Sequence, residues 1–492
     1  MKIVVVGGGT AGWLAALMIS KIRPDHTVTC IESSKIGIIG AGEGSTGSLT
    51  NIVQNEMFDF GCNEQDFIKE CDATIKLGIK HIGWNEDPSK FYYGPIDGTP
   101  TSNDRCDIVF QHALGYRDQN YLHLATELGY KIHHNKNSFV QINGNHAYHF
   151  DAHKVGQYFK KICDTVTHID SEVEHVQLDS ESGFVRSVKL SNGDTVQGDM
   201  FIDASGFNQV LMKAVGGKWK SYKENLPVNG ALPFLLPYED DEVIQPVTNA
   251  WAQNNGWCWQ IPTKNRRGCG YVFSDEFVTP DQAHAELEQT IGRKVDPIRH
   301  IKFDSGRQET LWIKNVLSIG LCAAFAEPLE ATSIHTTIMQ LKHFVYGCLG
   351  KDQNDTCNIG TVDDYNKKNA HLYDTMKDFL VAHYTCGRKD TDFWKYINSG
   401  ATSTDFVNSM HEVCKHRVPN ATLFPRQEGS AGWPLWSYVL AGTGALKSEV
   451  AEKEVKFNDD EIVGDSAYAY HVTDFDNMSK DLPDNTDYIR NM

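Results

Sequence analysis

Residues 2–22 read "KIVVVGGGTAGWLAALMISKI", and this stretch decides the fold of the chain. The continuous β-branched run at 3–6 is typical of a strand that is buried on both faces of a parallel sheet. The glycines at 7–9 make a tight turn, and the apolar residues after Gly12 have the spacing of one helix face. A second such run, "TVTCIES" at 27–33, predicts the strand that completes a βαβ unit.

The turn carries the pattern Gly7-x-Gly9-x-x-Gly12, and Glu32 ends the second strand about twenty residues later. Gly7 permits the turn, Gly9 lets backbone amides approach a pyrophosphate, and Gly12 lets the helix pack closely on the strand. The helix N-terminus then faces the phosphates, and Glu32 can accept the hydrogens of both ribose hydroxyls. The pattern predicts a dinucleotide site without separating NAD from FAD.

Two further stretches favour FAD. The loop "GIIGAGEGSTG" at 37–47 is glycine-rich and longer than the turn of a simple dehydrogenase, and the late strand "MFIDASG" at 200–206 ends in small residues. A distant strand of this kind suits a fold that closes over an extended FAD. The sequence has no second G-x-G-x-x-G for NADPH, so the flavin must receive its electrons from another source.

We expect an α/β fold built on an FAD-binding, Rossmann-like module at residues 1–345. Strands of a substrate-side sheet are expected as insertions at about 76–150 and 215–300. Residues 346–492 should form a mostly helical substrate-capping region, with the longest helical run at 362–386. No Pro/Gly/Ser-rich linker separates these parts, so we expect one continuous body.

Composition limits the classes of partner. The chain has 492 residues, of which 40% are hydrophobic, as in a globular protein. Its formal net charge of -18 argues against a nucleic-acid partner, which would need a basic face. No apolar run approaches the roughly 20 residues of a spanning helix, so we expect no membrane partner.

The 12 cysteines are scattered without a C-x-x-C pair, and the sequence starts without the apolar stretch of a secretory signal. We therefore expect free thiols in a reducing cytoplasm. We expect no metal site, because "HEVCKH" at 411–416 has one residue too many for an H-E-x-x-H zinc helix. The oligomeric state stays open, and a homo-oligomer is one alternative.

Residues 256–262 read "GWCWQIP". In a strand, Trp257 and Trp259 point to one face, while Cys258 and Gln260 point to the other. One explanation is core packing, which the stretch by itself favours because tryptophan buries a large area. The other is a rigid aromatic wall beside a cofactor or a substrate.

Together these stretches resemble the flavin-dependent tryptophan halogenase family, which consists of two-component enzymes that use FADH2. The resemblance rests on "VVVGGGTAGWLAA", "GAGEGST", "IKLGIKHIGW", "FDAHKVGQYFK", "FIDASG", "GWCWQIP" and "SIGLCAAFAEPLEATSI". It runs from residue 3 to about 385 and returns at 438–444 and 482–490. Its most specific element is W-x-W-x-I-P, which separates these halogenases from related monooxygenases. The resemblance implies the GR2-type fold of flavin monooxygenases.

The resemblance also implies a mechanism with two chambers. FADH2 and O2 form a flavin hydroperoxide that oxidises a halide ion (chloride, bromide or iodide) to hypohalous acid. The acid passes through a tunnel and halogenates an aromatic small molecule of the indole, phenol or aniline type by electrophilic substitution. A separate flavin reductase supplies the FADH2. In this scheme Trp257 and Trp259 shield the flavin from the organic substrate.

Two residues are implied to be catalytic. Lys76, in "ATIKLGIK", matches the family's essential lysine, which hydrogen-bonds hypohalous acid or forms a haloamine. Its apolar neighbours would lower the pKa of a lysine, and Lys80 is the rival four residues later. Glu330, in "EPLEATS", matches the carboxylate that faces the lysine, orients the oxidant and accepts the proton released by the ring. Glu327 in the same motif is expected to be structural.

Thr332 and Ser333 match the pair whose backbone amides hold the halide at a helix start. The family has S-T-G after the glutamate, whereas this chain has A-T-S, and the added serine leaves the halide preference open. The residues implied to bind FAD are Gly7, Gly9, Thr10, Ala11, Gly12, Glu32, Ala41, Glu43, Val173, Asp203, Leu321 and Ile334.

The substrate side departs further from the family. The stretch "SKFYYGPIDG" at 89–98 lacks the histidine-led pattern, and the C-terminal segment is shortened and keeps Trp433 and Trp436 as candidate stacking partners. We expect Tyr93 and Trp433 to contact the substrate. Fewer wall residues predict a wider pocket and a substrate other than free tryptophan.

Two alternatives remain at this stage. A flavin monooxygenase or reductase of the same superfamily, acting on an aromatic substrate, should lack W-x-W-x-I-P and the tunnel lysine. A catalytically inactive flavin-binding protein would not need Lys76 and Glu330, both of which are present.

Overall fold

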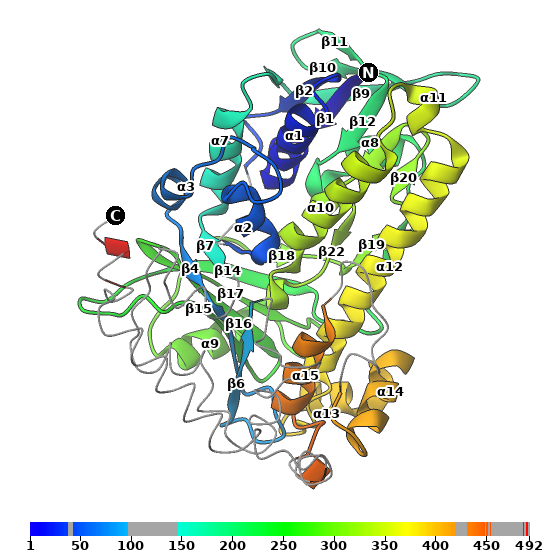
Figure 1. Ribbon diagram of the computed structural model, residues 1–492. Coiled ribbons are helices and arrows are strands. Elements are labelled where there is room, and N and C mark those ends of the chain that lie inside the picture. Colours follow the sequence, from blue (N-terminus) through cyan, green and yellow to red (C-terminus); the bar gives the residue numbers. More distant parts are fainter. Residues whose placement is uncertain are drawn as a thin grey trace.

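The computed structural model describes residues 1–37, 43–96, 146–419 and 431–447, together with 449–450, 453, 486 and 489–490. Strands and helices are mixed up to about residue 350, and helices follow from there (Figure 1). The expected α/β fold with a mostly helical C-terminal part is therefore confirmed. Within the described residues, no helix is both long and apolar enough to cross a membrane.

A six-stranded sheet near the top of Figure 1 contains the N-terminal βαβ unit. Its strands, in their order across the sheet, are β20 (Trp312–Ile313), β21 (Val316–Ser318), β12 (Met200–Asp203), β1 (Lys2–Val6), β2 (Thr27–Glu32) and β8 (Thr167–Asp170). β1 lies between β2 and β12 and is parallel to both, while the edge strand β20 is antiparallel to its neighbour.

Both faces of β1 are buried, which explains its continuous apolar run. Ile3 and Val5 belong to the large core that also contains the apolar residues of α1 (Thr10–Ile22). Val4 and Val6 belong to a second core on the other face, together with Val188. A strand covered on both sides needs apolar residues at every position rather than at every second one.

The second large sheet has seven strands and lies below the first in Figure 1. Its strands, in order, are β18 (Ile301–Lys302), β14 (Gly230–Pro237), β17 (Arg266–Phe273), β16 (Gly256–Pro262), β15 (Val247–Ala252), β5 (Gly78–Ile82) and β6 (Phe91–Pro95). Strands from 76–150 and from 215–300 thus meet in one sheet, where β5 runs parallel to β15. The division into a 1–345 module and a 346–492 capping region stays a prediction.

Three small antiparallel sheets complete the strands of the described residues. One contains β11 (Thr195–Gln197), β10 (Val185–Leu190) and β9 (Val173–Leu178); one contains β13 (Trp219–Ser221), β19 (Gly306–Gln308) and β22 (Ala324–Phe325); one contains β3 (Glu43–Gly44), β7 (Ala147–Phe150) and β4 (Thr74–Lys76). The last of these carries Lys76, and β4 leads directly into β5 of the seven-stranded sheet.

Helices connect the two large sheets and close the lower end of the molecule. They are α2 (Gly47–Val53), α3 (Glu64–Glu70), α7 (Ala152–Ile162), α8 (Val210–Ala214), α9 (Pro280–Ile291), α10 (Thr332–Lys342), α11 (Gln353–Thr356), α12 (Ile359–Tyr384), α13 (Asp392–Tyr396), α14 (Asp405–Cys414) and α15 (Trp433–Gly442). α12 runs from the level of the six-stranded sheet down to that of the seven-stranded sheet (Figure 1). It therefore brings its C-terminal end close to the lower sheet.

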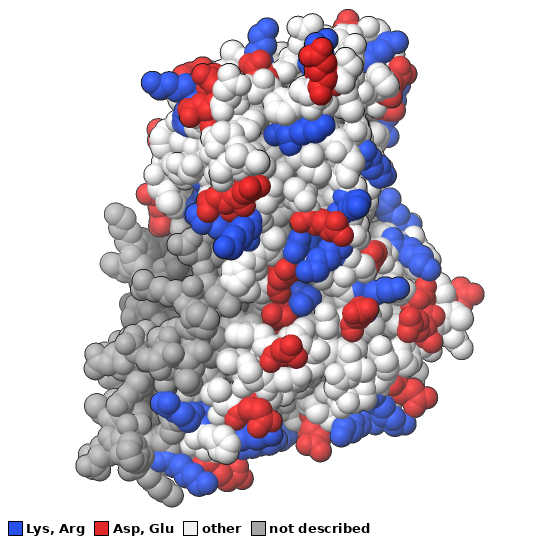
Figure 2. All heavy atoms as spheres, turned by 90° about the vertical axis from the view of Figure 1, so that its right-hand side faces the viewer, with Lys and Arg blue, Asp and Glu red and all other residues white. Residues whose placement is uncertain are grey.

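The described surface carries charges of both signs, and the described cysteines form no disulfide. On the face shown in Figure 2, the described Lys and Arg side chains alternate with Asp and Glu rather than forming a basic patch. The cysteines in the described part of the chain are free, and nearly all of them are buried.

The contact between β16 and β17 gives a test of the core. Gly270 lies opposite Trp259, and a Cβ atom at Gly270 would lie 2.0 Å from the indole ring. We predict that Gly270→Ala lowers the free energy of unfolding by about 1–3 kcal/mol, because the ring must leave its packed position. Chemical denaturation measures this difference.

Gly360→Ala is the matched control, since Gly360 is exposed in the first turn of α12 and a Cβ there meets only Asn358 Oδ1, at 3.6 Å. Its stability should be unchanged or higher by about 0.5–1 kcal/mol, because alanine favours a helix over glycine. Equal stabilities for the two alanine variants would contradict the close packing of Trp259 on β17.

Candidate functional site

The turn between β1 and α1 requires glycine at two positions. Gly7 has φ of +118°, in the region that favours glycine, and a Cβ there would lie 2.2 Å from the Ala204 carbonyl oxygen. A Cβ at Gly12 would lie 1.9 Å from the Gly7 oxygen. These two glycines let β1, β12 and α1 approach one another as the sequence pattern predicts.

Gly9 leaves space for a ligand. A Cβ atom there would meet nothing within 4 Å, so the volume beside the start of α1 is open. No side chain caps α1, and no acidic residue lies in its first turn, which begins with Thr10 and Ala11. Uncapped amides beside an open space suit a pyrophosphate, so the residues present fit the dinucleotide part of FAD.

Glu32 lies against this turn, because a Cβ at Gly8 would be 1.9 Å from its Oε2. Its carboxylate accepts a hydrogen bond from Trp13 Nε1 at 3.1 Å and from Lys160 Nζ, and His168 Nε2 lies 2.9 Å from Oε1. Lys160 and His168 come from α7 and β8, so the local sequence around Glu32 did not point to them. A ribose hydroxyl would share the carboxylate with these donors.

Asp203 uses its carboxylate within its own chain. It accepts hydrogen bonds from the backbone and hydroxyl of Ser205 and from the backbone N–H groups of Leu211 and Met212. The side chain is fully buried at the end of β12. Its observed contacts thus hold the loop after β12 against α8, and a direct FAD contact stays a prediction.

Two other predicted flavin residues lie near the dinucleotide turn. A Cβ at Gly320 would lie 2.7 Å from the Cβ of Ala11, which brings the short turn containing Leu321 next to the start of α1. Val173 begins β9, two residues after Ser171, whose N–H donates to the Glu32 carbonyl oxygen at 2.8 Å.

The remaining predicted flavin residues lie around α10 and β3. Ile334 is buried in α10. Glu43 lies on β3, where burial and the negative charge of Asp151 raise its pKa to about 7. Ala41 lies outside the described residues. Flavin contacts of Ile334 and Glu43 stay predictions.

Lys76 ends β4 and is fully buried. Its Nζ donates a hydrogen bond to the Ser45 carbonyl oxygen at 3.0 Å. A Cβ at Gly44 would lie 3.2 Å from this Nζ and 3.6 Å from the Cβ of Ala331. The lysine amine therefore lies near the residue that follows Glu330, although the two segments are far apart in the sequence.

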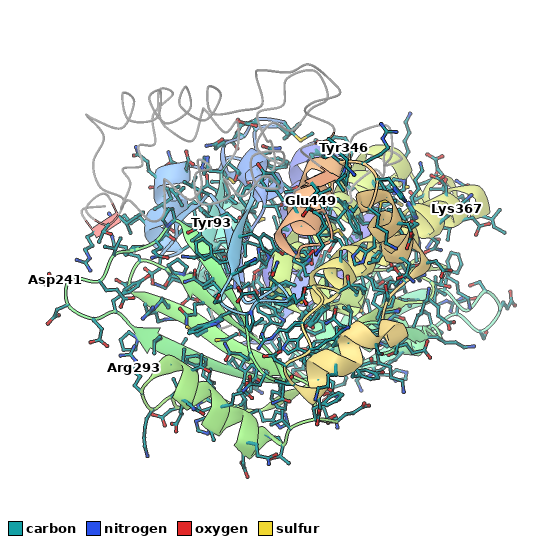
Figure 3. The ribbon with its side chains drawn as sticks, turned by 90° about the horizontal axis from the view of Figure 1, so that it is seen from below. Tyr93, Asp241, Arg293, Tyr346, Lys367 and Glu449 are labelled. Carbon is teal, nitrogen blue, oxygen red and sulfur yellow. The ribbon has the colours of Figure 1, made fainter. Side chains whose placement is uncertain are left out.

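The Lys80 side chain packs on aromatic rings of β6. Its Nζ lies 4.3 Å from the ring centroid of Phe91 and 5.5 Å from that of Tyr93. Lys80 pairs with Tyr93 across β5 and β6, and their neighbours His81 and Tyr92 form the next pair on the opposite face. Tyr93, labelled in Figure 3 on the edge strand β6, is fully buried on the Lys80 face, so the structure does not bring it to Glu330.

Glu330 immediately precedes Ala331 at the start of α10, and two histidines hold its carboxylate. His81 Nε2 lies 3.0 Å from Oε1, and His383 Nε2 lies 2.8 Å from the same oxygen. Both histidine side chains have zero exposure, while that of Glu330 is 14% exposed. No sequence motif pointed to either histidine, although each is a polar residue inside an apolar stretch, "IKHIGW" and "LVAHYT".

The charges of these groups follow from their surroundings. Burial would raise the pKa of Glu330, but the hydrogen bond from His383 and the close contact with His81 outweigh burial and hold it well below its usual range. Burial lowers the pKa of His81 to about 4, against the opposing effect of Glu330. At neutral pH the site therefore contains an ionised Glu330 beside a neutral His81.

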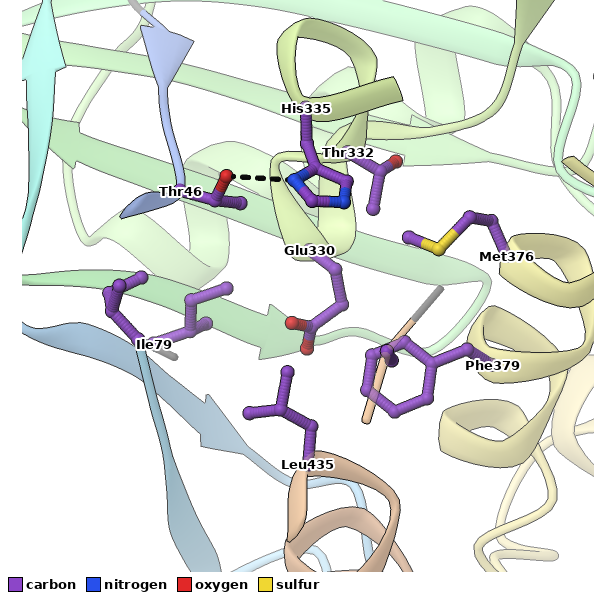
Figure 4. A pocket seen from close by; sticks show the side chains of 10 residues that line it. Thr46, Ile79, Glu330, Thr332, His335, Met376, Phe379 and Leu435 are labelled. Carbon is purple, nitrogen blue, oxygen red and sulfur yellow. Dashed lines mark hydrogen bonds between the residues drawn. The ribbon is translucent and has the colours of Figure 1, made fainter. Parts of the chain in front are cut away.

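A pocket opens beside Glu330 and encloses about 510 Å³ of space between atoms, part of it open to solvent. Its described lining residues are Thr46, Ile79, Ile96, Glu330, Thr332, His335, Met376, Phe379, Ala431 and Leu435. Figure 4 shows the Glu330 carboxylate pointing into this ring of side chains, between Ile79 and Phe379. Thr46 contacts His335 Nδ1 at 3.1 Å, which joins the loop after β3 to α10.

Thr332 and Ser333 are the first two residues of α10. No side chain caps this helix, and Ala331 before it has φ of +53°, in the left-handed region that alanine disfavours. Thr332 also lines the pocket. Uncapped amides at a helix start can hold an anion, so the halide role of this pair stays a prediction with a consistent local geometry.

Trp257 and Trp259 lie on the same face of β16 with ring centroids 6.1 Å apart, as expected for a strand. The Trp84 ring lies 6.2 Å from that of Trp257 and also 6.2 Å from that of His383. The tryptophan pair therefore belongs to the core, and the Trp84 ring connects Trp257 to His383. Shielding of the flavin by this pair stays a prediction.

The predicted substrate tryptophan Trp433 begins α15, and its side chain lies outside the described residues. Trp436, one turn later, is 2% exposed and packs with ring centroids 5.2 Å from Phe379 and 5.2 Å from Phe406. It supports Phe379, which lines the pocket, from behind.

Glu327, at the other end of the Pro328–Glu330 turn, is in the opposite state from Glu330. Its side chain has zero exposure, and among the described residues neither oxygen has a hydrogen-bond partner of good geometry. Burial raises its pKa to about 8, although the nearby Tyr384 hydroxyl opposes this. Glu327 is therefore a neutral carboxylic acid at pH 7.

A family model described as tryptophan halogenase matches residues 2–458. The chain is 31% identical over 491 residues to tryptophan 6-halogenase SttH of Streptomyces toxytricini, covering 90% of each chain. It is 32% identical over 431 residues to tryptophan 7-halogenase RebH of Lentzea aerocolonigenes, covering 80% of this chain and 78% of RebH. The solved structure of Tar14, a tryptophan C-6 flavin-dependent halogenase from taromycin biosynthesis, matches with a TM-score of 0.89 at 26% identity over the whole of both chains.

The neutral state of Glu327 gives a prediction about pH. Its ordinary pKa of 4.5 rises to about 8 in the folded chain, so between these values the folded state holds a proton that the unfolded state has lost. This group therefore lowers the free energy of unfolding as pH rises through that range, by up to about 1.4 kcal/mol per pH unit. We predict that Glu327→Gln removes this contribution, measured by urea titrations at pH 5.5 and 8.

The exposed Glu276 provides the control, because Glu276→Gln should keep the original pH dependence. If Glu327→Gln also kept it, the carboxyl group of Glu327 would have to be ionised in the folded protein.

Proposed function

We propose, from the premise that this chain belongs to the tryptophan halogenase family and is an FADH2-dependent halogenase, that the pocket beside Glu330 is where an aromatic ring is halogenated. The observation that supports this location is that three candidate site residues lie close together. Glu330 and Thr332 line one pocket, and the buried Lys76 amine lies near Ala331, the residue between these two. These are the groups that electrophilic halogenation needs: a donor to orient the halogen and a base to take a proton.

The enzyme uses FADH2, O2 and a halide ion. When bound, the reduced flavin and O2 supply the oxidising equivalents that turn halide into an electrophilic halogen. The turn at 7–12 and Glu32 would hold the dinucleotide part, while Leu321 and Ile334 would lie at the flavin ring. A separate flavin reductase delivers the reduced cofactor.

Lys76 would orient the electrophilic halogen. Its amine is buried at the end of β4 and tethered by the 3.0 Å hydrogen bond to the Ser45 carbonyl oxygen. A lysine amine can donate more than one hydrogen bond, so the same group can hold its tether and orient a hypohalous acid. A buried and tethered donor loses little freedom when the oxidant arrives, which favours one approach to the ring.

Glu330 would complete the substitution. As the halogen adds to a ring carbon, the new carbon–halogen bond forms and the halogen–oxygen bond breaks. The same carbon then loses its proton to the Glu330 carboxylate, which restores the aromatic ring. An ionised carboxylate that points into the pocket can accept this proton directly (Figure 4).

The lining of the pocket supports an aromatic substrate without a carboxylate. Ile79, Met376, Phe379 and Leu435 provide apolar surface, and the described lining residues include no lysine or arginine. The relatives SttH and RebH are named as tryptophan halogenases, and the carboxylate of a free amino acid is costly to bury in an apolar lining unless a cation or hydrogen-bond donors receive it. We therefore favour an indole, phenol or aniline whose side chain lacks that negative charge.

We also place the reaction in the reducing cytoplasm, beside the flavin reductase. The described cysteines are free and mostly buried, which suits a compartment where disulfides do not form.

The role of Lys76 can be tested with its neighbour as control. We predict that Lys76→Ala lowers the rate of bromination by at least about 100-fold, because the electrophile loses its orienting donor, while FAD still binds. Lys80→Ala should stay within about threefold of the original rate, since its amine packs on Phe91 and Tyr93. Mass spectrometry of the product and flavin fluorescence provide the two measurements. Survival of halogenation in Lys76→Ala would contradict the mechanism.

The substrate class can be tested with a panel containing indole, tryptamine, free tryptophan, phenol and aniline, assayed with chloride, bromide and iodide in parallel. We predict that at least one substrate without a carboxylate exceeds free tryptophan by about tenfold or more in kcat/KM. A clear preference for free tryptophan would contradict the proposal that the substrate lacks a carboxylate. The parallel assays with chloride, bromide and iodide measure how serine at position 333 affects the choice of halide.

A further inference from the structure

We propose that His81 and His383 form a two-imidazole clamp on Oε1 of Glu330, which fixes this side chain as an anion and leaves Oε2 to face the substrate. The inference rests on the role proposed above for Glu330. Both histidines act through Glu330 rather than on the substrate, so they are positioning residues. Neither was implied by the sequence motifs.

The clamp acts on one oxygen of the carboxylate. His81 Nε2 and His383 Nε2 lie 3.0 Å and 2.8 Å from Oε1, from opposite elements, β5 and α12. For both imidazoles, the shortest contact with the carboxylate is to Oε1 rather than to Oε2. Because Glu330 lines the pocket and is 14% exposed, the second oxygen is the one available to a bound ring.

Packing fixes the directions of both imidazoles. The His81 ring stacks on Tyr92 with centroids 4.6 Å apart and planes within 10°, and a Cβ at Gly94 would lie 3.5 Å from its Cε1. His383 Nδ1 lies 2.9 Å from the Phe379 carbonyl oxygen, one turn earlier in α12. Both rings have zero exposure. Packing therefore keeps His383 Nε2 hydrogen-bonded to Oε1, and His81 Nε2 in contact with it, before any substrate arrives.

The two histidines contact Oε1 in different ways. Both nitrogens of His383 face acceptors, since Nδ1 lies 2.9 Å from the Phe379 carbonyl oxygen and Nε2 lies 2.8 Å from Glu330 Oε1. His81 is neutral, because burial lowers its pKa to about 4, and its Nε2 lies 3.0 Å from Oε1 without the angles of a hydrogen bond. The carboxylate beside Nε2 favours the tautomer of His81 that carries its hydrogen on this nitrogen.

Other titratable groups surround the clamp on each packed element. They are Lys76 on β4, Tyr92 on β6, His335 on α10 and Cys386 after α12. His81 and His383 are distinguished from these by nitrogens at contact distance from Oε1. Their removal should therefore change the affinity of Glu330 for a proton more than any other single substitution.

The clamp has a direct consequence for the pH dependence of the reaction. Burial alone would make Glu330 take up a proton more readily, and a protonated Glu330 cannot accept the proton of the ring. Activity that depends on ionised Glu330 is present above its pKa and lost below it. Removing a donor raises that pKa, so the acidic limb of the activity profile moves to higher pH.

The experiment compares His81→Phe, which removes the imidazole beside Oε1, with His81→Gln, which places an N–H group there. Single turnovers of bromination with chemically reduced FAD, from about pH 4 to pH 9, remove any pH dependence of the reductase. Because the pKa of Glu330 lies well below its usual range, the original enzyme should keep its activity down to the acidic end of this range. We expect His81→Phe to lose kcat there, with an acidic limb at least about one pH unit higher and KM changed less than about threefold. His81→Gln should restore part of the lost activity. A His81→Phe profile that coincides with the original one would overturn the clamp.

Further measurements separate the ways in which the idea can fail. Thermal unfolding and FAD binding check that each variant is folded; if His81→Phe does not fold, His81→Gln and His383→Gln must show the same upward shift, or the clamp is wrong. Activity in Glu330→Gln would overturn the proposed role of Glu330 itself. An inactive Glu330→Gln with an unshifted His81→Phe would overturn the clamp alone.

A bound metal is the competing explanation, since donor atoms of His81, Glu330 and His383 all lie within 4.8 Å of one another. We expect no loss of activity in EDTA and no stoichiometric zinc after incubation with ZnCl2 and desalting. Stoichiometric metal whose removal abolishes activity would replace the clamp with a metal centre.

Discussion

An ionised carboxylate with only 14% of its side chain exposed is the constraint around which this structure is arranged. Removing such a charge from water costs several kcal/mol unless donors replace the lost hydration. Glu330 meets this requirement with His81 and His383, both fully buried. Each histidine comes from a different part of the chain, so the fold must bring three distant segments together before this charge is stable.

Three elements bring these residues together. β5 lies within the seven-stranded sheet and presents His81 and Ile79 on one face. α12 is long enough to reach from the six-stranded sheet to this face, where it presents His383 and Phe379 (Figure 1). The start of α10 delivers Glu330 between them. Because the same three elements also line the pocket, the charge that is costly to bury is placed where chemistry can use it.

The short turn from 327 to 330 contains two carboxyl groups in opposite states. Glu327 lacks a partner of good geometry and becomes a neutral acid, with a pKa raised by burial to about 8. Glu330, a few residues away, is kept ionised by two imidazoles. Different surroundings thus separate the proton affinities of two identical side chains, as in other enzymes that need an acid and a base in one site.

The sequence by itself determined the local parts of this protein. The strand at 2–6, the glycine turn, α1 and the tryptophan alternation in β16 depend on residue spacing and backbone sterics, which neighbouring residues encode. The motifs also pointed to Lys76 and Glu330 as candidate catalytic residues. Only the tertiary structure decided that Lys80 and Tyr93 face away from Glu330, and that His81 and His383 contact it. The register of β5 with β6 and the path of α12 fix these contacts. They are long-range properties, because no local pattern specifies which face of a distant element a histidine will meet.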